Sequence, residues 1–265
     1  MLDELKLAME RLADPAKAAV LARFFRTGPG QYGQGDVFLG ITVPRQRALA
    51  KAHVPMPLSD IAKLLASRVH EHRLTALLIL IGKYEKAPAS ARDGRRATRT
   101  ADATAKDCRR VTPSTEEKKR IYDFYLSHTA GVNNWDLVDL SAPNIVGDYL
   151  LSRPRGRGVL YRLARSSNLW ERRIAILATY AFIRARQFED TLKIAEMLLG
   201  DGHDLIHKAV GWMLREIGKR DQAAEEAFLH CHAADMPRTA LRYAIERFPD
   251  KKRKAYLAVP RRPRL

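Results

Sequence analysis

Arg173-Ile174-Ala175-Ile176-Leu177 is followed 35 residues later by a similar stretch, Lys208-Ala209-Val210-Gly211-Trp212. In both, a basic residue stands directly before a small and apolar helical run. Arg73-Leu74-Thr75-Ala76-Leu77 reads as a third copy and Arg238-Thr239-Ala240-Leu241 as a fourth. Helical pairs that recur at roughly 35–47 residues are typical of HEAT or armadillo arrays. The repeat therefore predicts an all-α fold, an α-solenoid of HEAT-like helical repeats.

Such an array curves and offers a long concave surface. If the basic residue of each copy lies at one position of an inner helix, these residues line that surface and form a concave basic groove. The alternative is that they are solvated ends of ordinary helices. The pattern alone does not decide between these two interpretations.

The rest of the chain also has helical patterns. Asp14 is expected to cap a helix that has Pro15 at its first position and extends to Arg26. Residues 28–35 contain four glycines and a proline and predict a loop. Helices are expected to resume at Pro44, Pro57 and His70, and no stretch alternates as a strand does.

Charge is the second strong feature. The formal net charge is +17 and the pI about 10.1, as expected of a nucleic-acid binder. Residues 251–265 contribute +7 and residues 88–115 contribute +4. Residues 88–115 lack apolar periodicity, so we predict a mobile basic insertion there. We expect a single helical-repeat domain over residues 1–258 and a basic C-terminal tail over residues 259–265.

Several classes of protein are disfavoured. The two cysteines, Cys108 and Cys231, have neither metal-ligand spacing nor a disulfide framework, which fits a reducing cytoplasm. The histidines show no ligand pattern, so we expect neither a metal nor a cofactor. The first residues read as an amphipathic helix and not as a signal peptide. No apolar run is long enough to span a bilayer, so no membrane partner is expected.

Trp135 and Asp139, in the stretch Asn134-Trp135-Asp136-Leu137-Val138-Asp139, are the first candidate site residues. Their spacing places an indole and a carboxylate on one side of a helix. A carboxylate beside an indole suits the stabilisation of a developing positive charge. The alternative is that Trp135 packs in a core and that Asp139, close to a helix boundary, is a cap.

Two further residues are candidates for binding. Arg173, in Trp170-Glu171-Arg172-Arg173, could hold a phosphate with two hydrogen bonds, or could pair with Glu171 or with a neighbouring helix. Trp212 could pack on a nucleotide sugar or base, although a Trp between Gly211 and Met213 more often packs in a core.

These pieces resemble the DNA alkylation repair family of the AlkD type, which comprises HEAT-like DNA glycosylases. The resemblance extends over about residues 15–258, except 88–115. It depends on five stretches in the right order: Phe24-Phe25-Arg26-Thr27-Gly28-Pro29-Gly30 with Phe38-Leu39-Gly40-Ile41-x-x-Pro44, Asn134-Trp135-Asp136-Leu137-Val138-Asp139, Trp170-Glu171-Arg172-Arg173-x-Ala175, and Lys208-Ala209-Val210-Gly211-Trp212-x-x-Arg215-Glu216.

The resemblance implies roles for four residues. Asp139 would be the catalytic carboxylate, Trp135 and Trp212 would cradle the lesion nucleotide, and Arg173 would lie near a backbone phosphate. The implied activity is excision of cationic N3- and N7-alkylated purines from double-stranded DNA in base excision repair, by a monomer. A HEAT-repeat nucleic-acid-binding scaffold without chemistry is the alternative.

Overall fold

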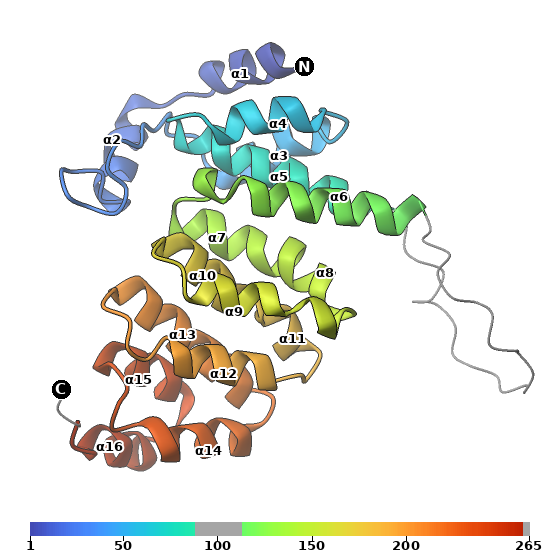
Figure 1. The fold of residues 1–265 in the computed structure, drawn as a ribbon. Helices are drawn as coiled ribbons and strands as arrows, with labels where there is room; N and C mark the ends of the chain where they lie inside the picture. Colours follow the sequence, from blue (N-terminus) through green and yellow to red (C-terminus); the bar gives the residue numbers. More distant parts are fainter. Residues whose placement is uncertain (88–112, 262–265) are drawn as a thin grey trace, which may run out of the picture. The chain divides into compact units, whose positions relative to one another are not determined.

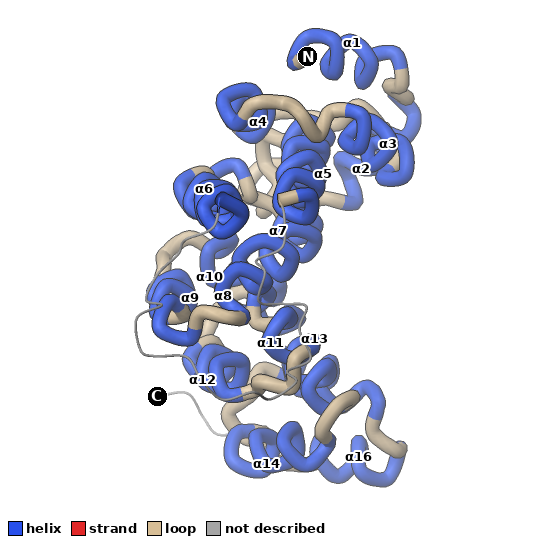
Figure 2. Tube along the Cα trace, turned by 90° about the vertical axis from the view of Figure 1, so that its right-hand side faces the viewer, coloured by secondary structure: helices blue, strands red, loops and turns tan. Residues whose placement is uncertain are grey.

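The computed structural model describes residues 1–87 and 113–261. They form two compact units, Met1–Gly131 and Val132–Leu265. Helices and loops make up both units in the described ranges, and the only strand-like pairing there is an isolated bridge between Val37 and Val69 (Figure 2). This confirms the predicted all-α, helical-repeat class. No helix within the described ranges is long and apolar enough to cross a membrane.

The first unit is built around one buried helix. Its helices are α1 (Leu2–Arg11), α2 (Pro15–Phe24), α3 (Val43–Ala52), α4 (Leu58–Leu65), α5 (His70–Lys86) and α6 (Pro113–Ser127), followed by a short 3-10 turn, Thr129–Gly131 (Figure 1). Asp14 caps α2 as predicted, since its carboxylate accepts the Lys17 N–H at 3.1 Å. Helix α5 contacts α3, α4 and α6 and is buried along most of its length.

The second unit stacks helices in two layers. Its helices are α7 (Trp135–Ala142), α8 (Asp148–Leu151), α9 (Gly158–Ala164), α10 (Leu169–Ala178), α11 (Tyr180–Arg184), α12 (Glu189–Met197), α13 (Asp204–Gly218), α14 (Gln222–His232), α15 (Arg238–Ala244) and α16 (Asp250–Ala258). Helices α7, α10, α13 and α15 contact one another in that order, while α9 packs on α10 and both α12 and α14 pack on α13. The two central helices of this series, α10 and α13, therefore each have neighbours from the preceding and the following repeat.

Breaks and glycines let the inner layer pack closely. Residues Pro143–Gly147 form a π-helical turn between α7 and α8, where Pro143 cannot donate a backbone hydrogen bond. A side chain at Gly147 would meet the Ala178 carbonyl at 2.1 Å, and one at Gly211 would meet the Ala240 carbonyl at 2.3 Å. Both glycines are thus required by the close approach of neighbouring helices.

The repeat is visible in the hydrogen bonds that open three inner helices. Ser67, Ser166 and Asp201 each accept, through the side chain, the backbone N–H two residues later. The carbonyl of each bonds the side chain six residues later, which belongs to Arg73, Arg172 and His207 respectively. The 35-residue spacing is confirmed, because Ser166 and Asp201 differ by that number.

The same bonds correct the register between the first copy and the next two. The counterparts of Arg73 are Arg172 and His207, and not Arg173 and Lys208, so the predicted alignment with Arg73 is wrong by one residue. Arg238 is the first residue of α15 and bonds the Val259 carbonyl, whereas Arg173 is the fifth residue of α10. Arg73, Arg173 and Arg238 therefore do not occupy one equivalent position, and the concave basic groove expected from them stays a prediction.

The predicted insertion and the predicted tail lie largely outside the described residues. Residues 88–112 of the expected insertion lie outside the described residues, and α6 already begins at Pro113. The helix α16 ends at Ala258, where the tail was expected to begin, and residues 262–265 also lie outside the described part. The single-domain interpretation stays a prediction.

Candidate functional site

Asp139 and Arg173 form a two-pronged ion pair between α7 and α10. The Arg173 Nε donates to Asp139 Oδ1 at 2.8 Å, and Nη2 donates to Oδ2 at 2.8 Å. The remaining nitrogen, Nη1, donates to the Leu205 carbonyl at the start of α13. One guanidinium thus ties three successive inner helices together.

This geometry excludes a capping role for Asp139 and gives Arg173 a partner on a neighbouring helix, while the functional roles of both residues stay predictions. Asp139 is the fifth residue of α7 and is no cap, because the cap is Asn134, whose side chain accepts the Trp135 N–H at 2.8 Å. Arg173 pairs with a neighbouring helix. Its nitrogens are engaged by Asp139 and Leu205, so a phosphate contact would require one of these bonds to be exchanged.

The carboxyl group of Asp139 is held in an unfavourable setting for charge. Burial raises its pKa, Arg173 opposes the rise through its charge and hydrogen bonds, and nearby Asp136 adds to it; the net pKa lies above the ordinary value. The Asp139 side chain nevertheless keeps 18% of its surface exposed, while Arg173 keeps 5%. The side chain is therefore partly exposed, and the raised pKa makes its carboxylate a better proton acceptor than a solvated aspartate.

The two tryptophans lie in different surroundings. Trp135 is the first residue of α7 and is partly exposed, one helical turn before Asp139. Trp212 is also partly exposed, but its ring lies 6.3 Å from that of Tyr180, and its Nε1 donates to Glu216 Oε1 at 3.3 Å. Leu205 and Trp212 are seven residues apart on α13, which corresponds to about 10 Å along the helix axis. The expectation that Trp212 and Asp139 act on one nucleotide stays a prediction.

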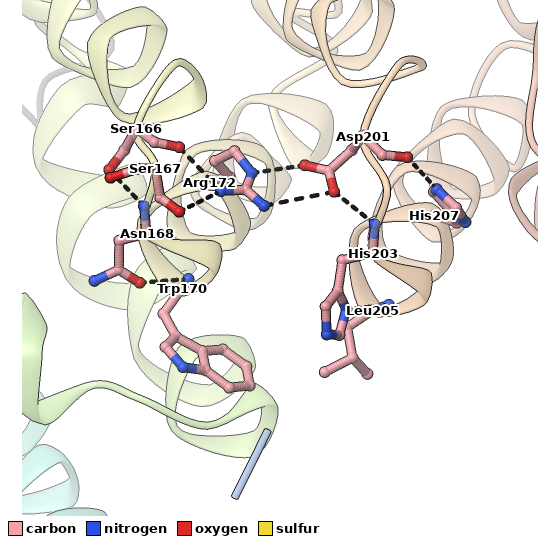
Figure 3. Close-up of polar contacts among 9 residues, drawn as sticks. All are labelled: Ser166, Ser167, Asn168, Trp170, Arg172, Asp201, His203, Leu205 and His207. Atoms are coloured by element: carbon pink, nitrogen blue, oxygen red, sulfur yellow. Dashed lines mark hydrogen bonds and ion pairs between the residues drawn. The ribbon is translucent and has the colours of Figure 1, made fainter. Parts of the chain in front are cut away.

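A parallel network beside the pair shows what a purely structural arginine does. Arg172 donates to both carboxylate oxygens of Asp201 and to the carbonyls of Ser166 and Ser167. Figure 3 shows these bonds joining the loop before α10 to the loop before α13, with Trp170 anchored by Asn168. Trp170 is 8% exposed and belongs to the core. Two adjacent arginines of α10 thus bind two different acids. Arg173 binds Asp139, which precedes α10 in the chain, and Arg172 binds Asp201, which follows it.

The pairing of Asp139 with Arg173 was not among the predictions from sequence. The available signal was their separation of 34 residues, close to one repeat, which brings neighbouring inner helices together. Residues 1–87 and 113–261 hold no group of three or more His, Cys, Asp or Glu side chains suited to a metal ion.

The arrangement suits chemistry at a cationic centre. A partly exposed carboxylate, kept in place by a guanidinium and preceded by an indole, can stabilise positive charge that develops nearby or accept a proton from a water molecule. The fixed ion pair also reduces the reorganisation that such stabilisation would require.

Comparison with known proteins points to DNA repair. The family model described as "DNA alkylation repair enzyme" matches residues 5–248. A solved structure described as a predicted DNA alkylation repair enzyme from Enterococcus faecalis is similar, with a TM-score of 0.63 and 16% identity over 90% of this chain and 97% of that one. The structure of smu.31 from Streptococcus mutans UA159 is similar with a TM-score of 0.51 and 14% identity, over 78% and 93%. No curated protein matches the chain.

Proposed function

Because this chain belongs to the family of DNA alkylation repair enzymes, we propose that it is a DNA glycosylase acting on cationic N3- and N7-alkylated purines in double-stranded DNA. The observation that supports the proposal most is the Asp139–Arg173 pair. It supplies a fixed carboxylate, partly open to solvent, on an inner helix. The basic composition supplies affinity for the polyanion.

The chemistry fits a carboxylate acting without a general acid. An alkylated purine of this kind already has a positive charge, so the C1′–N bond can break with its electron pair leaving on the base, which departs neutral. Positive charge then develops on the sugar, and the ionised Asp139 stabilises it. Water forms the new C1′–O bond, and Asp139 accepts the proton that the water loses.

Arg173 has a positioning role in this proposal. It holds both carboxylate oxygens, so that Asp139 presents one orientation, and its charge opposes the pKa rise that burial causes. The indole of Trp135, one turn away, offers a face to the cationic sugar or base. Trp212 is proposed to contact the same strand. The protein would act as a cytoplasmic monomer on DNA held in a concave basic groove.

The experiment is incubation with duplex DNA that contains N7-methylguanine, scored for the free base. Single-turnover release by the wild-type chain above the spontaneous rate supports the proposal. Release at the spontaneous rate, in conditions where the protein binds the duplex, contradicts it.

One observation favours the alternative, a HEAT-repeat scaffold that binds nucleic acid without chemistry. The bidentate pair and the Leu205 contact fasten three helices, which is a sufficient structural reason for Asp139 and Arg173. A scaffold would bind DNA, release no base, and lose stability but no activity when the pair is removed.

A further inference from the structure

A second cluster, separate from the Asp139–Arg173 pair, combines aromatic rings of α11 and α13 with a cation of α11 and another just after α13. The two helices contact each other. We call Tyr180, Arg184, Trp212 and Arg220 the Tyr180 platform. The Arg184 guanidinium lies over the Tyr180 ring at 5.4 Å and that of Arg220 at 5.8 Å. The centroid of the Trp212 ring lies 6.3 Å from that of Tyr180.

The platform has a rigid base. Glu216, which is 5% exposed, accepts hydrogen bonds from Trp212 Nε1 at 3.3 Å, from Lys219 at 2.5 Å and from Arg220 at 3.1 Å. One buried carboxylate therefore fixes the indole and one of the two arginines. Burial works to raise the pKa of Glu216, but the bonds from Lys219 and Arg220 lower it below the ordinary value, so it stays ionised.

Arg184 differs from Arg220 in having no carboxylate to neutralise it. Within the described ranges it has no acidic side chain at salt-bridge distance, and it is exposed. Arg220, which lies over the same Tyr180 ring, is by contrast paired with Glu216 at 3.1 Å. The cluster is therefore positive, with one cation free for an anionic partner and two partly exposed rings beside it.

This combination matches the chemistry of a nucleotide backbone. A guanidinium binds phosphate oxygens with directional hydrogen bonds, and aromatic faces pack on sugars or bases. We propose that the Tyr180 platform is a DNA-backbone contact in addition to the Trp212 contact proposed above, in which Arg184 binds a phosphodiester and the ring of Tyr180 packs against the adjoining deoxyribose. The inference deepens the proposed function, on which it rests for the identity of the ligand.

The test is binding of the full chain to undamaged duplex DNA, titrated at several salt concentrations. Arg184→Ala should lower the magnitude of the slope of log K against log salt by about 0.9, the value for one phosphate contact. Arg162→Ala is the matched control, because Arg162 is an exposed arginine of α9 outside the platform. It removes the same charge and should leave the slope unchanged.

The aromatic part has a different readout. Tyr180→Leu should weaken binding at least roughly fivefold, as the loss of one stacking contact does, without changing the slope. Tyr180→Phe retains the ring and should restore affinity, which separates a ring contact from a folding defect. An unchanged slope in Arg184→Ala, an equal change in Arg162→Ala, or wild-type affinity in Tyr180→Leu would each overturn the proposal.

The two proposals fail separately. If the wild type releases no N7-methylguanine but Arg184→Ala still lowers the slope of log K against log salt, the glycosylase proposal is wrong and the platform proposal stands. If the wild type excises the base and Arg184→Ala binds as wild type does, the platform is wrong and the glycosylase proposal stands.

Discussion

Asp36 and Asp139 each pair with an arginine, one in each compact unit, yet their pKa values move in opposite directions. Arg73 Nη2 lies 2.6 Å from Asp36 Oδ2, and His70 adds a second contact at 3.3 Å. Burial works to raise the pKa of Asp36, but the hydrogen bond from His70 and the charge of Arg73 bring it below the ordinary value. For Asp139, burial outweighs Arg173 and the pKa is raised.

The difference separates a structural acid from a candidate catalytic one. The side chain of Asp36 is 5% exposed and is held by Arg73 and His70, whereas that of Asp139 is 18% exposed, is held by Arg173 alone among the described residues and has Asp136 nearby. A buried carboxylate that is bonded by several side chains stabilises the fold and is closed to substrate. A carboxylate with a single bonded side chain is less stable as an anion and stays available to stabilise positive charge on a substrate.

Asp139→Asn should have the largest effect on base release. The amide retains the shape but loses the charge, so we expect base release to fall by about 10²–10³, as for the loss of one transition-state contact. Binding to undamaged duplex should persist. Release of N7-methylguanine under single turnover measures the effect, and a wild-type rate would exclude Asp139 as the catalyst.

Asp36→Asn should show the opposite pattern. It leaves Arg73 buried without its counter-charge, which costs on the order of 3–5 kcal/mol of unfolding free energy. Urea unfolding measures the loss, and excision per folded molecule should not change. Asp60→Asn, in an exposed pair with Lys63, is the control and should cost less than about 1 kcal/mol.

The two acids should also give opposite pH dependences of stability. The pKa of Asp36 is below its unfolded value of 3.8, so its contribution is present above pH 3.8 and is lost as pH falls through the folded pKa. The pKa of Asp139 is above 3.8, so its contribution is present below pH 3.8 and is lost as pH rises through the folded pKa. Unfolding of each Asn variant between pH 3 and 7 checks both signs.

Arg173→Lys tests how much of the Asp139 setting depends on the guanidinium. Lysine retains the charge but cannot make the two parallel hydrogen bonds, so the pKa of Asp139 should rise further. The acidic limb of the excision profile should move to higher pH, with a smaller loss of rate than Asp139→Asn causes. Arg172→Lys, which disturbs the neighbouring pair with Asp201, should leave that limb in place.

Glu225 is a third buried acid, and unlike Asp36 and Asp139 it has no ion pair with a basic side chain among the described residues. It is 2% exposed, its Oε1 has no hydrogen-bond partner, and burial with the charge of Glu226 raises its pKa to about 8. Stability should fall as pH rises from 4.5 to about 8. Glu225→Gln should remove that fall and stabilise the protein above pH 8 by a few kcal/mol, at ~1.4 kcal/mol per pKa unit.

The smallest effect is expected from the basic tail, which lies outside both pairs. Truncation after Pro260 removes three arginines and should reduce the salt slope of DNA binding by at most about 2.7, at ~0.9 per phosphate contact. It retains α16 and the bond from Arg238 to the Val259 carbonyl. Single-turnover excision at saturating protein should not change, and a lower rate would show that the tail does more than bind.

The class of the fold and the starts of several helices follow from the sequence alone. Capping at Asp14, prolines at helix starts and a 35-residue repeat are local signals, because they depend on residues one helix or one repeat apart. The spacing of Trp135 and Asp139 likewise sufficed to place them on one helix. The family resemblance, confirmed over residues 5–248, supplied the order of the motifs.

The tertiary structure decided which side chains meet. Arg172 and Arg173 are adjacent and chemically identical, yet one holds Asp201 and the other Asp139, because neighbouring residues of a helix point about 100° apart. The register of Arg73 and the contact of Tyr180 with Trp212 also depend on how helices pack. A shift of one residue along a helix changes which acid an arginine binds, and composition does not reveal it. The burial and the number of partners of each carboxylate then determine whether it stabilises the fold or remains available for chemistry.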